Sequence, residues 1–238
     1  MINLKDLSDA FQFKSELHAH TSPVSRCSEI PVPNFVDNYI ALGCDSLMIT
    51  NHLTPEYADS SFPDYTAEYY LSDYFAALEY AKDKNINILL GAEVRFPENM
   101  NDYLVYGISP EDIEKIITLL PYGIENFYKQ FKNNKNVILQ AHPFRKRMEL
   151  APLSSIDGIE TMNMHPGHNS AVAFAARYAR DNNLLVSGGT DYHHPGHQGM
   201  CLMRTKSPMR DSFDIAETIK SRQFLFDLSG HLVIPNQL

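Results

Sequence analysis

The sequence predicts an α/β protein with a parallel sheet or barrel built from strand–helix units. Strand-like and helix-like segments alternate along the 238 residues, which is typical of such folds. Hydrophobic residues make up 44% of the chain and no Gly/Ser-rich linker divides it, so we expect one domain over residues 1–238. Five apolar segments end in His, Glu or Asp, and strand ends are where barrel folds place their chemistry.

The predicted strands are short apolar runs bounded by turn residues. They cover residues 16–20, 46–50, 86–93, 103–108, 137–142, 158–163 and 184–191. A hairpin that turns at Ser229 and Gly230 is expected near the C-terminus.

Helices are predicted between these strands from apolar residues at helical spacing and from signals at the helix ends. They cover residues 31–42, 66–83, 111–120, 123–132, 169–181 and 213–220. Gly43 ends the first of these helices, and Asn169 or Ser170 is the expected N-cap of the fifth.

Charge and cysteine content argue against several classes of protein. The net charge of −9 disfavours binding of long nucleic acids, although a bound metal ion would still permit a small anionic substrate. No apolar run approaches the roughly 20 residues of a membrane span. The first residues lack the features of a secretory signal and the 3 cysteines are sparse, so we expect reduced thiols and a cytoplasmic location.

Polar residues at the strand ends form the pattern that carries chemistry. The segments are His18-Ala-His20, Thr50-Asn-His52, Gly91-Ala-Glu93, Gln140-Ala-His142 and Gly189-Thr-Asp191-Tyr-His193. Alternate residues of a strand share a face, and the C-terminal strand ends of a parallel barrel meet at one mouth. The side chains expected to converge there are His18, His20, His52, Glu93, His142, Asp191 and His193. They are too many for one zinc ion and suit two or three divalent ions, with Glu93 and Asp191 as bridges.

One histidine at a strand end is usually an ordinary polar residue, so the prediction depends on the whole set. Burying two carboxylates and five imidazoles without a metal would cost on the order of several kcal/mol per unpaired charge. The combined pattern therefore favours a metal site.

In type and order, these motifs resemble the PHP (polymerase and histidinol phosphatase) superfamily of metal-dependent phosphoesterases. That superfamily has a His-x-His, a Thr-Asp-His-like element, an isolated His and a Gly-Ser-Asp-x-His-like element, and the likeness covers about residues 15–200. The resemblance implies a distorted (β/α)7 barrel with two or three zinc, manganese or iron ions at the C-terminal strand ends. It also implies a ligand set for each ion: His18, His20, Glu93 and Asp191 for one, His52 and His193 for a second, and His142 with Glu93 for a third.

Three positions depart from the superfamily pattern. Asn51 stands where an Asp often precedes the His of the second motif, so weaker support for His52 is expected. In the loop after the first motif, Cys27 or Glu29 could supply a further ligand, or both could simply face solvent. Asp102 stands where a His is often found and could replace it as a ligand. Loss of these ligands could leave two ions instead of three.

Further polar side chains are expected at the same mouth. Arg145 is the first candidate for binding phosphate, because its guanidinium matches phosphate geometry, and Arg26 is the second. His165 and His168 follow the sixth strand, and either could protonate the leaving oxygen. We take Arg145 and His168 as the catalytic candidates, and His165 and His197 as substrate contacts.

The predicted function is hydrolysis of a small phosphate monoester or nucleotide by a metal-activated water. The expected partner is therefore a small phosphorylated molecule, with no membrane and no nucleic acid beyond nucleotides. Residues 57–65 could form a lid over the mouth. One alternative is an amidohydrolase, which shares the His-x-His on a barrel strand but usually bridges its metals with a carboxylated Lys. The other is a non-catalytic metal-binding module. Substrate, metal and oligomeric state stay open.

Overall fold

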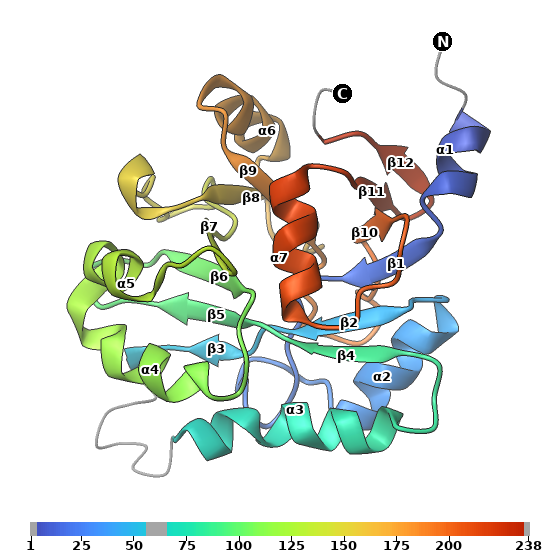
Figure 1. Cartoon of the computed structure of the whole chain (residues 1–238), viewed down its shortest axis with the longest axis horizontal. Coiled ribbons are helices and arrows are strands. Elements are labelled where there is room, and N and C mark those ends of the chain that lie inside the picture. Colours follow the sequence, from blue (N-terminus) through green and yellow to red (C-terminus); the bar gives the residue numbers. More distant parts are fainter. Residues whose placement is uncertain (1–3, 56–65, 236–238) are drawn as a thin grey trace.

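The computed structural model describes residues 4–55 and 66–235, and its strands form two sheets (Figure 1). The first sheet contains β1 (Phe13–Glu16), β2 (Ser46–Ile49), β4 (Asn87–Leu90), β10 (Leu202–Thr205), β11 (Leu225–Leu228) and β12 (His231–Val233). The second contains β3 (His52–Leu53), β5 (Ala92–Arg95), β6 (Asp102–Tyr106), β7 (Val137–Gln140), β8 (Gly158–Asn163) and β9 (Leu185–Gly189). The strand orders are β12-β11-β10-β1-β2-β4 and β3-β5-β6-β7-β8-β9.

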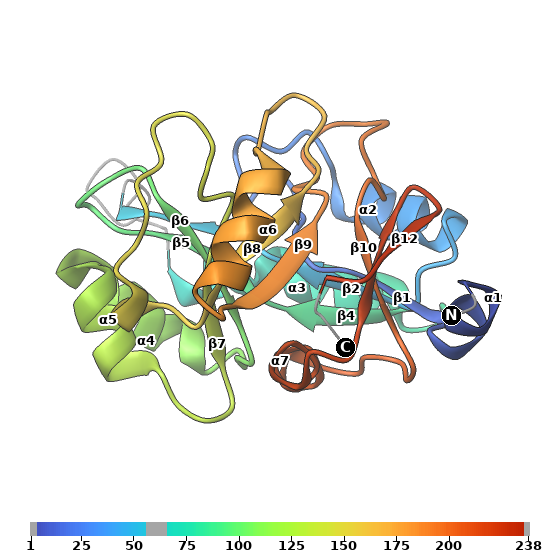
Figure 2. The same ribbon diagram turned by 90° about the horizontal axis from the view of Figure 1, so that it is seen from above.

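The helices pack around these two sheets. They are α1 (Leu4–Ala10), α2 (Val32–Ala41), α3 (Ala67–Ala81), α4 (Asp112–Leu119), α5 (Gly123–Phe131), α6 (Val172–Asp181) and α7 (Ser212–Ser221), with short 3-10 helices at Leu120–Tyr122 and Leu153–Ser155. In Figure 1, α3 runs along one side of the molecule past β3, β2 and β4. The helix α6 packs on β8, as Figure 2 shows from above, and α7 contacts β6 and β9.

The expected closed (β/α)7 barrel is not confirmed, because neither sheet closes on itself within the described ranges. The predicted strand 86–93 is divided between the two sheets at Gly91. The predicted strand 46–50 ends at Ile49, and the unpredicted strand β3 starts at His52 in the other sheet. The Gly91 N–H donates to the Ile49 carbonyl at 2.9 Å, and a Cβ at Gly91 would lie 2.9 Å from the Met48 sulfur. The sheets are also mixed, since β10 pairs antiparallel with β1 and β11, and β6 pairs antiparallel with β5 and β7.

All the predicted helices are present, with shifted ends, and the C-terminal hairpin β11–β12 is confirmed. The helix α1 and the strand β10 were not predicted. The predicted N-cap of α6 is wrong, because the N-cap is Ala171, which has a left-handed φ of 48° and no side-chain cap. The Asn169 side chain accepts a hydrogen bond from the Ala171 N–H, so it forms the turn before the helix instead.

Two clusters of buried apolar side chains form the core. The larger cluster lies between the second sheet and α4, α5 and α7, and it includes Leu104, Ile138 and Ile159. The smaller one lies between the first sheet and α2 and α3, and it includes Phe35 and Leu47. Both clusters include residues next to the predicted ligands, such as Leu17 in the larger and Ala19 in the smaller, so their packing holds the ligands in place.

Buried polar side chains join the two sheets next to the predicted site. The Tyr106 hydroxyl on β6 donates to the Leu17 carbonyl after β1, at 3.0 Å. Glu16 accepts hydrogen bonds at Oε1 from the N–H groups of Leu17, His18 and Thr190, and at Oε2 from the Tyr39 hydroxyl. Glu16 thus ties the end of β1 to the end of β9, which are the strands that precede the first and last metal motifs.

Among the described helices, none has both the length and the apolar character needed to cross a bilayer.

Substitution of Glu16 tests this junction. Glu16→Ala leaves three N–H groups and one hydroxyl buried without an acceptor, so we expect a loss of about 3 kcal/mol or more in the free energy of unfolding. Glu16→Gln keeps one oxygen for the three N–H groups and can donate to the Tyr39 hydroxyl, so its loss should stay below about 1 kcal/mol. Urea denaturation of both variants measures the difference. Equal losses would show that the hydrogen bonds of Glu16 do not hold the junction.

Candidate metal centre

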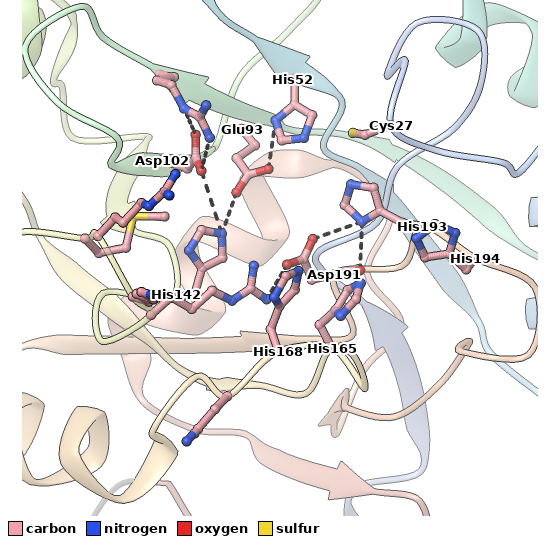
Figure 3. Close-up of a pocket in the computed structure, with 16 residues that line it drawn as sticks. Cys27, His52, Glu93, Asp102, His142, His165, His168, Asp191, His193 and His194 are labelled. Atoms are coloured by element: carbon pink, nitrogen blue, oxygen red, sulfur yellow. Dashed lines mark hydrogen bonds and ion pairs between the residues drawn. The ribbon is translucent and has the colours of Figure 1, made fainter.

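The Glu93 carboxylate lies at the centre of the predicted ligands and is almost fully buried. Its Oε1 is 3.3 Å from His18 Nε2 and 3.1 Å from His142 Nε2. Its Oε2 is 3.2 Å from His20 Nε2 and 3.1 Å from His52 Nδ1. Figure 3 shows the carboxylate between His52 and His142. Each oxygen faces two imidazole nitrogens, which is the arrangement expected of a carboxylate that bridges two ions.

Asp191 is the second carboxylate of the cluster. Its Oδ1 lies 3.5 Å from His18 Nε2, 3.4 Å from His20 Nε2 and 3.2 Å from His193 Nδ1. Asp191 has a φ of 55° and His142 a φ of 28°, and such left-handed backbone is uncommon for residues other than glycine. His142 lies two positions beyond the end of β7 and Asp191 two positions beyond the end of β9, and strain of this kind is common at functional sites.

Three sets of side chains bring their ligand atoms within 4.8 Å of one another in the described part of the chain. The sets are His18, His20, Glu93 and Asp191; His20, His52 and His193; and His52, Glu93 and Asp102. The first set is the one predicted to hold the first ion. The others place His52 with His193, as expected, and add Asp102 next to Glu93.

The spacing of these atoms fits divalent ions. Ligand atoms that share one ion at roughly 2.1 Å lie about 3.0–3.4 Å apart in tetrahedral or octahedral geometry. The nitrogen–oxygen distances from His18 and His20 to the two carboxylates run from 3.2 to 3.5 Å. The buried Nε2 atoms of these two histidines make no directed hydrogen bond within the described chain. An ion between each nitrogen and its carboxylate would satisfy both groups.

The electrostatics of the cluster point the same way. Burial would raise the pKa of Glu93 and Asp191, but the neighbouring histidines hold both pKa values well below the usual range. Burial opposes protonation of His18, yet the charges of Glu160, Asp191 and Glu93 raise its pKa well above the ordinary value. The carboxylates therefore favour positive charge at this position, and divalent ions would supply it in place of protons.

Glu160, on β8, orients two of the predicted ligands and was missed by the sequence analysis. Its Oε1 lies 2.8 Å from His18 Nδ1, and its Oε2 accepts a hydrogen bond from the His142 N–H at 3.0 Å. With Nδ1 bonded to a carboxylate, the Nε2 of His18 is left to face Glu93, as in metal sites where a carboxylate supports a histidine ligand. The only signal in the sequence is an acidic residue inside an otherwise apolar strand.

Asn51 and Ser25 orient His20. The Ser25 hydroxyl donates to Asn51 Oδ1 at 2.9 Å, because that oxygen also accepts the Thr21 N–H and can only accept. Ser25 Oγ must then accept from His20 Nδ1 at 3.2 Å and from the His52 N–H at 3.0 Å. This direction of donation puts the His20 proton on Nδ1 and leaves Nε2 free of it, as a metal ligand requires.

The charge that Asn51 lacks is supplied by Asp73 on α3. Asp73 accepts hydrogen bonds from the Thr21 hydroxyl at 2.8 Å and from the Val24 N–H at 3.2 Å, and the Asn51 amide donates to Thr21 Oγ1. A buried carboxylate therefore still supports the second motif, but it acts through Thr21 and Asn51 instead of standing at position 51 itself. Support for His52 runs through its own N–H and Ser25, a route that the sequence pattern does not reveal.

A cavity of about 580 Å³ opens over the cluster. Five predicted ligands line it, together with Cys27 and Asp102: His52, Glu93, His142, Asp191 and His193. The lining also includes the basic residues Arg95, Arg145, Lys146 and Arg147 and the histidines His165, His168 and His194. Cationic side chains and predicted metal ligands thus share one open space, which suits an anionic substrate.

Arg145 reaches this cavity, but it also contacts Asp191. Its Nη2 donates to Asp191 Oδ2 at 2.6 Å and to Asn163 Oδ1 at 2.5 Å, and its Nε donates to Ser170 Oγ at 3.2 Å. Nη1 has no hydrogen bond to the described residues. The guanidinium is therefore held in one orientation while one of its nitrogens stays available to a ligand in the cavity.

His165 and His168 stand together at the cavity wall, with ring centroids 4.5 Å apart. His165 Nδ1 accepts the Gly167 N–H at 2.9 Å, so the proton of the neutral ring is on Nε2. Burial is the main cause that lowers the pKa of His165 to about 4, and burial also lowers the pKa of His168. Both rings are therefore neutral near pH 7 and can donate hydrogen bonds.

Other predicted residues lie outside the cluster. Arg26 is exposed and does not line the cavity, and His197 packs behind His165, with ring centroids 5.6 Å apart. Glu29 is exposed, and its Oε2 lies 3.4 Å from His194 Nδ1. Cys27 lines the cavity beside His193 but belongs to none of the three ligand sets. The lid predicted at residues 57–65 lies outside the described residues.

A family model for the PHP domain matches residues 16–231, which span all the motifs described above. The chain belongs to the PHP domain family. This confirms the resemblance that the motifs indicated. None of the curated protein sequences matches the chain.

Solved structures share the fold at low sequence identity. A two-domain Bacteroides vulgatus protein with a predicted PHP-like metal-dependent phosphoesterase is 17% identical, with a TM-score of 0.64, over 90% of this chain and 64% of that one. A protein assigned as a metal-dependent phosphoesterase from Bifidobacterium adolescentis is 16% identical, with a TM-score of 0.51, over 88% and 96%. A Chromobacterium violaceum amidohydrolase is 14% identical, with a TM-score of 0.54, over 94% and 98%. The chain therefore spans slightly less than two thirds of the first of these proteins.

Glu160 provides a test of the metal centre that leaves all seven predicted ligands in place. In Glu160→Gln, an amide NH₂ would face the N–H of His142 or the Nδ1–H of His18, so one ligand loses its acceptor. We expect metal affinity to fall by roughly 10–100-fold. Titration with Mn²⁺ by calorimetry measures the change. The control is Glu98→Gln, because Glu98 lies between β5 and β6 and accepts the Ile124 N–H at the start of α5. Unchanged affinity in Glu160→Gln would show that Glu160 does not orient the ligands.

Proposed function

We propose that this protein is a metal-dependent phosphoesterase that hydrolyses a small phosphate monoester or a nucleotide. The observation that carries the proposal is the position of Glu93, whose two oxygens each face two imidazole nitrogens at 3.1–3.3 Å. Membership of the PHP domain family supports it. We assign the metal ligands as His18, His20, His52, Glu93, His142, Asp191 and His193.

Divalent zinc, manganese or iron ions bound by these residues would lower the pKa of a water molecule and offset the charge of the phosphoryl oxygens. Arg145 would bind a phosphoryl oxygen through Nη1, while its other nitrogens stay on Asp191, Asn163 and Ser170. Because these three partners fix the guanidinium, little side-chain entropy is lost when the substrate binds.

His165 and His168 would contact the oxygen of the leaving group. Because His165 Nδ1 accepts the Gly167 N–H, the Nε2 of the neutral ring has a proton and can donate a hydrogen bond. Since the pKa of each ring is lowered, we assign both as neutral hydrogen-bond donors that stabilise charge on the leaving oxygen. This assignment replaces the expectation that one of the two histidines transfers a proton to the leaving oxygen.

The size and charge of the cavity favour a small substrate. A volume of about 580 Å³ is in the usual range for small-molecule sites. Four basic residues, Arg95, Arg145, Lys146 and Arg147, line this opening, whereas the net charge of the whole chain is −9, which disfavours a long polynucleotide. Sugar phosphates, amino-alcohol phosphates and nucleotides are the classes to test.

A phosphate-release screen tests the proposal. The metal-loaded protein, with manganese or zinc, should release inorganic phosphate from at least one compound of these classes and should leave amides and lactones intact. The related fold of an amidohydrolase makes the second group a necessary arm. Turnover of an amide or lactone without phosphate release would favour an amidohydrolase. Bound metal with no turnover of either group would favour a non-catalytic module.

His20 and Asp191 should be essential for both metal binding and turnover. His20→Ala removes a nitrogen from two of the three ligand sets, and Asp191→Ala removes a buried carboxylate from the first. We expect each variant to lose at least about 10³-fold in kcat and to bind less metal. His231→Ala, which changes an exposed residue of the C-terminal hairpin, is the control. A His20 or Asp191 variant that keeps both properties would place the site elsewhere.

Arg145→Lys separates binding of phosphate from mere positive charge. Lys keeps the charge but cannot contact Asp191, Asn163 and Ser170 while also reaching into the cavity. We expect kcat/KM to fall by roughly 10²-fold with the metal content unchanged. Steady-state kinetics and metal analysis of the same preparation give both values. If kcat/KM is unchanged, Arg145 does not contact the substrate.

A further inference from the structure

The third of the expected ion positions lies between Glu93, His142 and Asp102. It differs from the other two positions because an arginine pairs with both oxygens of its aspartate. Arg95, on β5, forms a two-pronged ion pair with Asp102 on β6, because these two residues are register partners in the sheet. Arg95 Nε lies 2.7 Å from Asp102 Oδ1, and Arg95 Nη2 lies 2.8 Å from Oδ2. The Asp102 carboxylate is buried, with 4% of its side chain exposed, and both residues line the cavity.

Asp102 is placed where it could be a ligand. Its Oδ2 lies 3.9 Å from His142 Nε2, which itself lies 3.1 Å from Glu93 Oε1, and Asp102 also forms a ligand set with His52 and Glu93. A third ion at this position would therefore have His142, Glu93 and Asp102 around it. A third ion would bind here only if these groups had negative charge that no other cation already neutralises.

The two aspartates of the site differ in how they meet an arginine. Arg145 touches Asp191 through one oxygen, and the other oxygen of Asp191 faces three histidines of the cluster. Arg95 engages both oxygens of Asp102 at once. Asp191 thus keeps one oxygen for an ion, whereas the charge of Asp102 is already neutralised by a guanidinium that stays protonated at any ordinary pH.

We propose that the Arg95–Asp102 ion pair takes the place of a third metal ion, so that this centre holds two divalent ions. The proposal rests on the metal centre of the proposed function and narrows its number of ions. Glu93 is shared with the other positions, so the third position has no unpaired negative charge of its own. A divalent ion there would also lie beside the Arg95 guanidinium, which repels it. In that case His142, which the proposed function counts among the metal ligands, no longer binds an ion and instead bonds to Glu93 and positions it.

Metal counting on purified protein tests this directly. The full chain is stripped with a chelator, re-equilibrated with excess Mn²⁺, separated from free ions and analysed by mass spectrometry for manganese per chain. We expect two ions in the wild type and two in Asp102→Asn. Three ions in the wild type, or a fall to one in either protein, would overturn the proposal. No bound ion at all would contradict the proposed function itself, so the two failures are distinguishable.

Removing Arg95 should open the third position. Arg95→Met frees both oxygens of Asp102, and we expect the count to rise from two to three. The double variant Arg95→Met with Asp102→Asn should return it to two, and Arg95→Lys, which keeps the charge, should stay at two. A count of two in folded Arg95→Met would overturn the proposal. Circular dichroism checks the fold, and if Arg95→Met does not fold, the counts in the wild type and in Arg95→Lys still decide.

Discussion

Burial of the Glu93 carboxylate is the constraint on which the rest of the centre depends. An ionised carboxylate removed from water costs several kcal/mol unless opposite charge and hydrogen bonds surround it. Here four imidazoles from three different segments of the chain approach its two oxygens. The fold can keep Glu93 in this position only if positive charge is present, and that positive charge comes from protons or from metal ions. Metal binding and the stability of the fold are therefore coupled at this residue.

The division of the strands into two sheets makes this arrangement possible. The breaks after β2 and at Gly91 move His52 and Glu93 from the first sheet into the second, where they pair in parallel register. His18 and His20 follow β1, which belongs to the first sheet, so the cluster lies where the sheets adjoin. Glu16 and Tyr106 bridge the same junction with buried hydrogen bonds, and Glu160 reaches from β8 to His18. Supporting residues thus come from both sheets.

The sequence predicted which side chains come together around Glu93, because each predicted ligand stands at the end of an apolar segment and alternation puts neighbours on one face. It did not predict the supporting groups. Glu160 bonds to His18 and Asp73 accepts a hydrogen bond from Thr21, and in both cases the partners are distant in sequence and only the folded chain brings them together. Asn51 was expected to weaken support for His52, whereas it fixes the proton position of His20 through Ser25. The open sheets were missed because a bend at one glycine does not interrupt an apolar pattern.

The central claim is that the histidines and Asp191 around Glu93 hold divalent ions next to both of its oxygens. Crystals of the protein grown with manganese or zinc, measured with X-rays at the absorption edge of the metal, test it most directly. The account predicts anomalous peaks about 2.0–2.3 Å from Glu93, one shared with His18, His20 and Asp191 and another with His52 and His193. Peaks only elsewhere in the molecule, or none while the imidazoles still contact Glu93 directly, would contradict it.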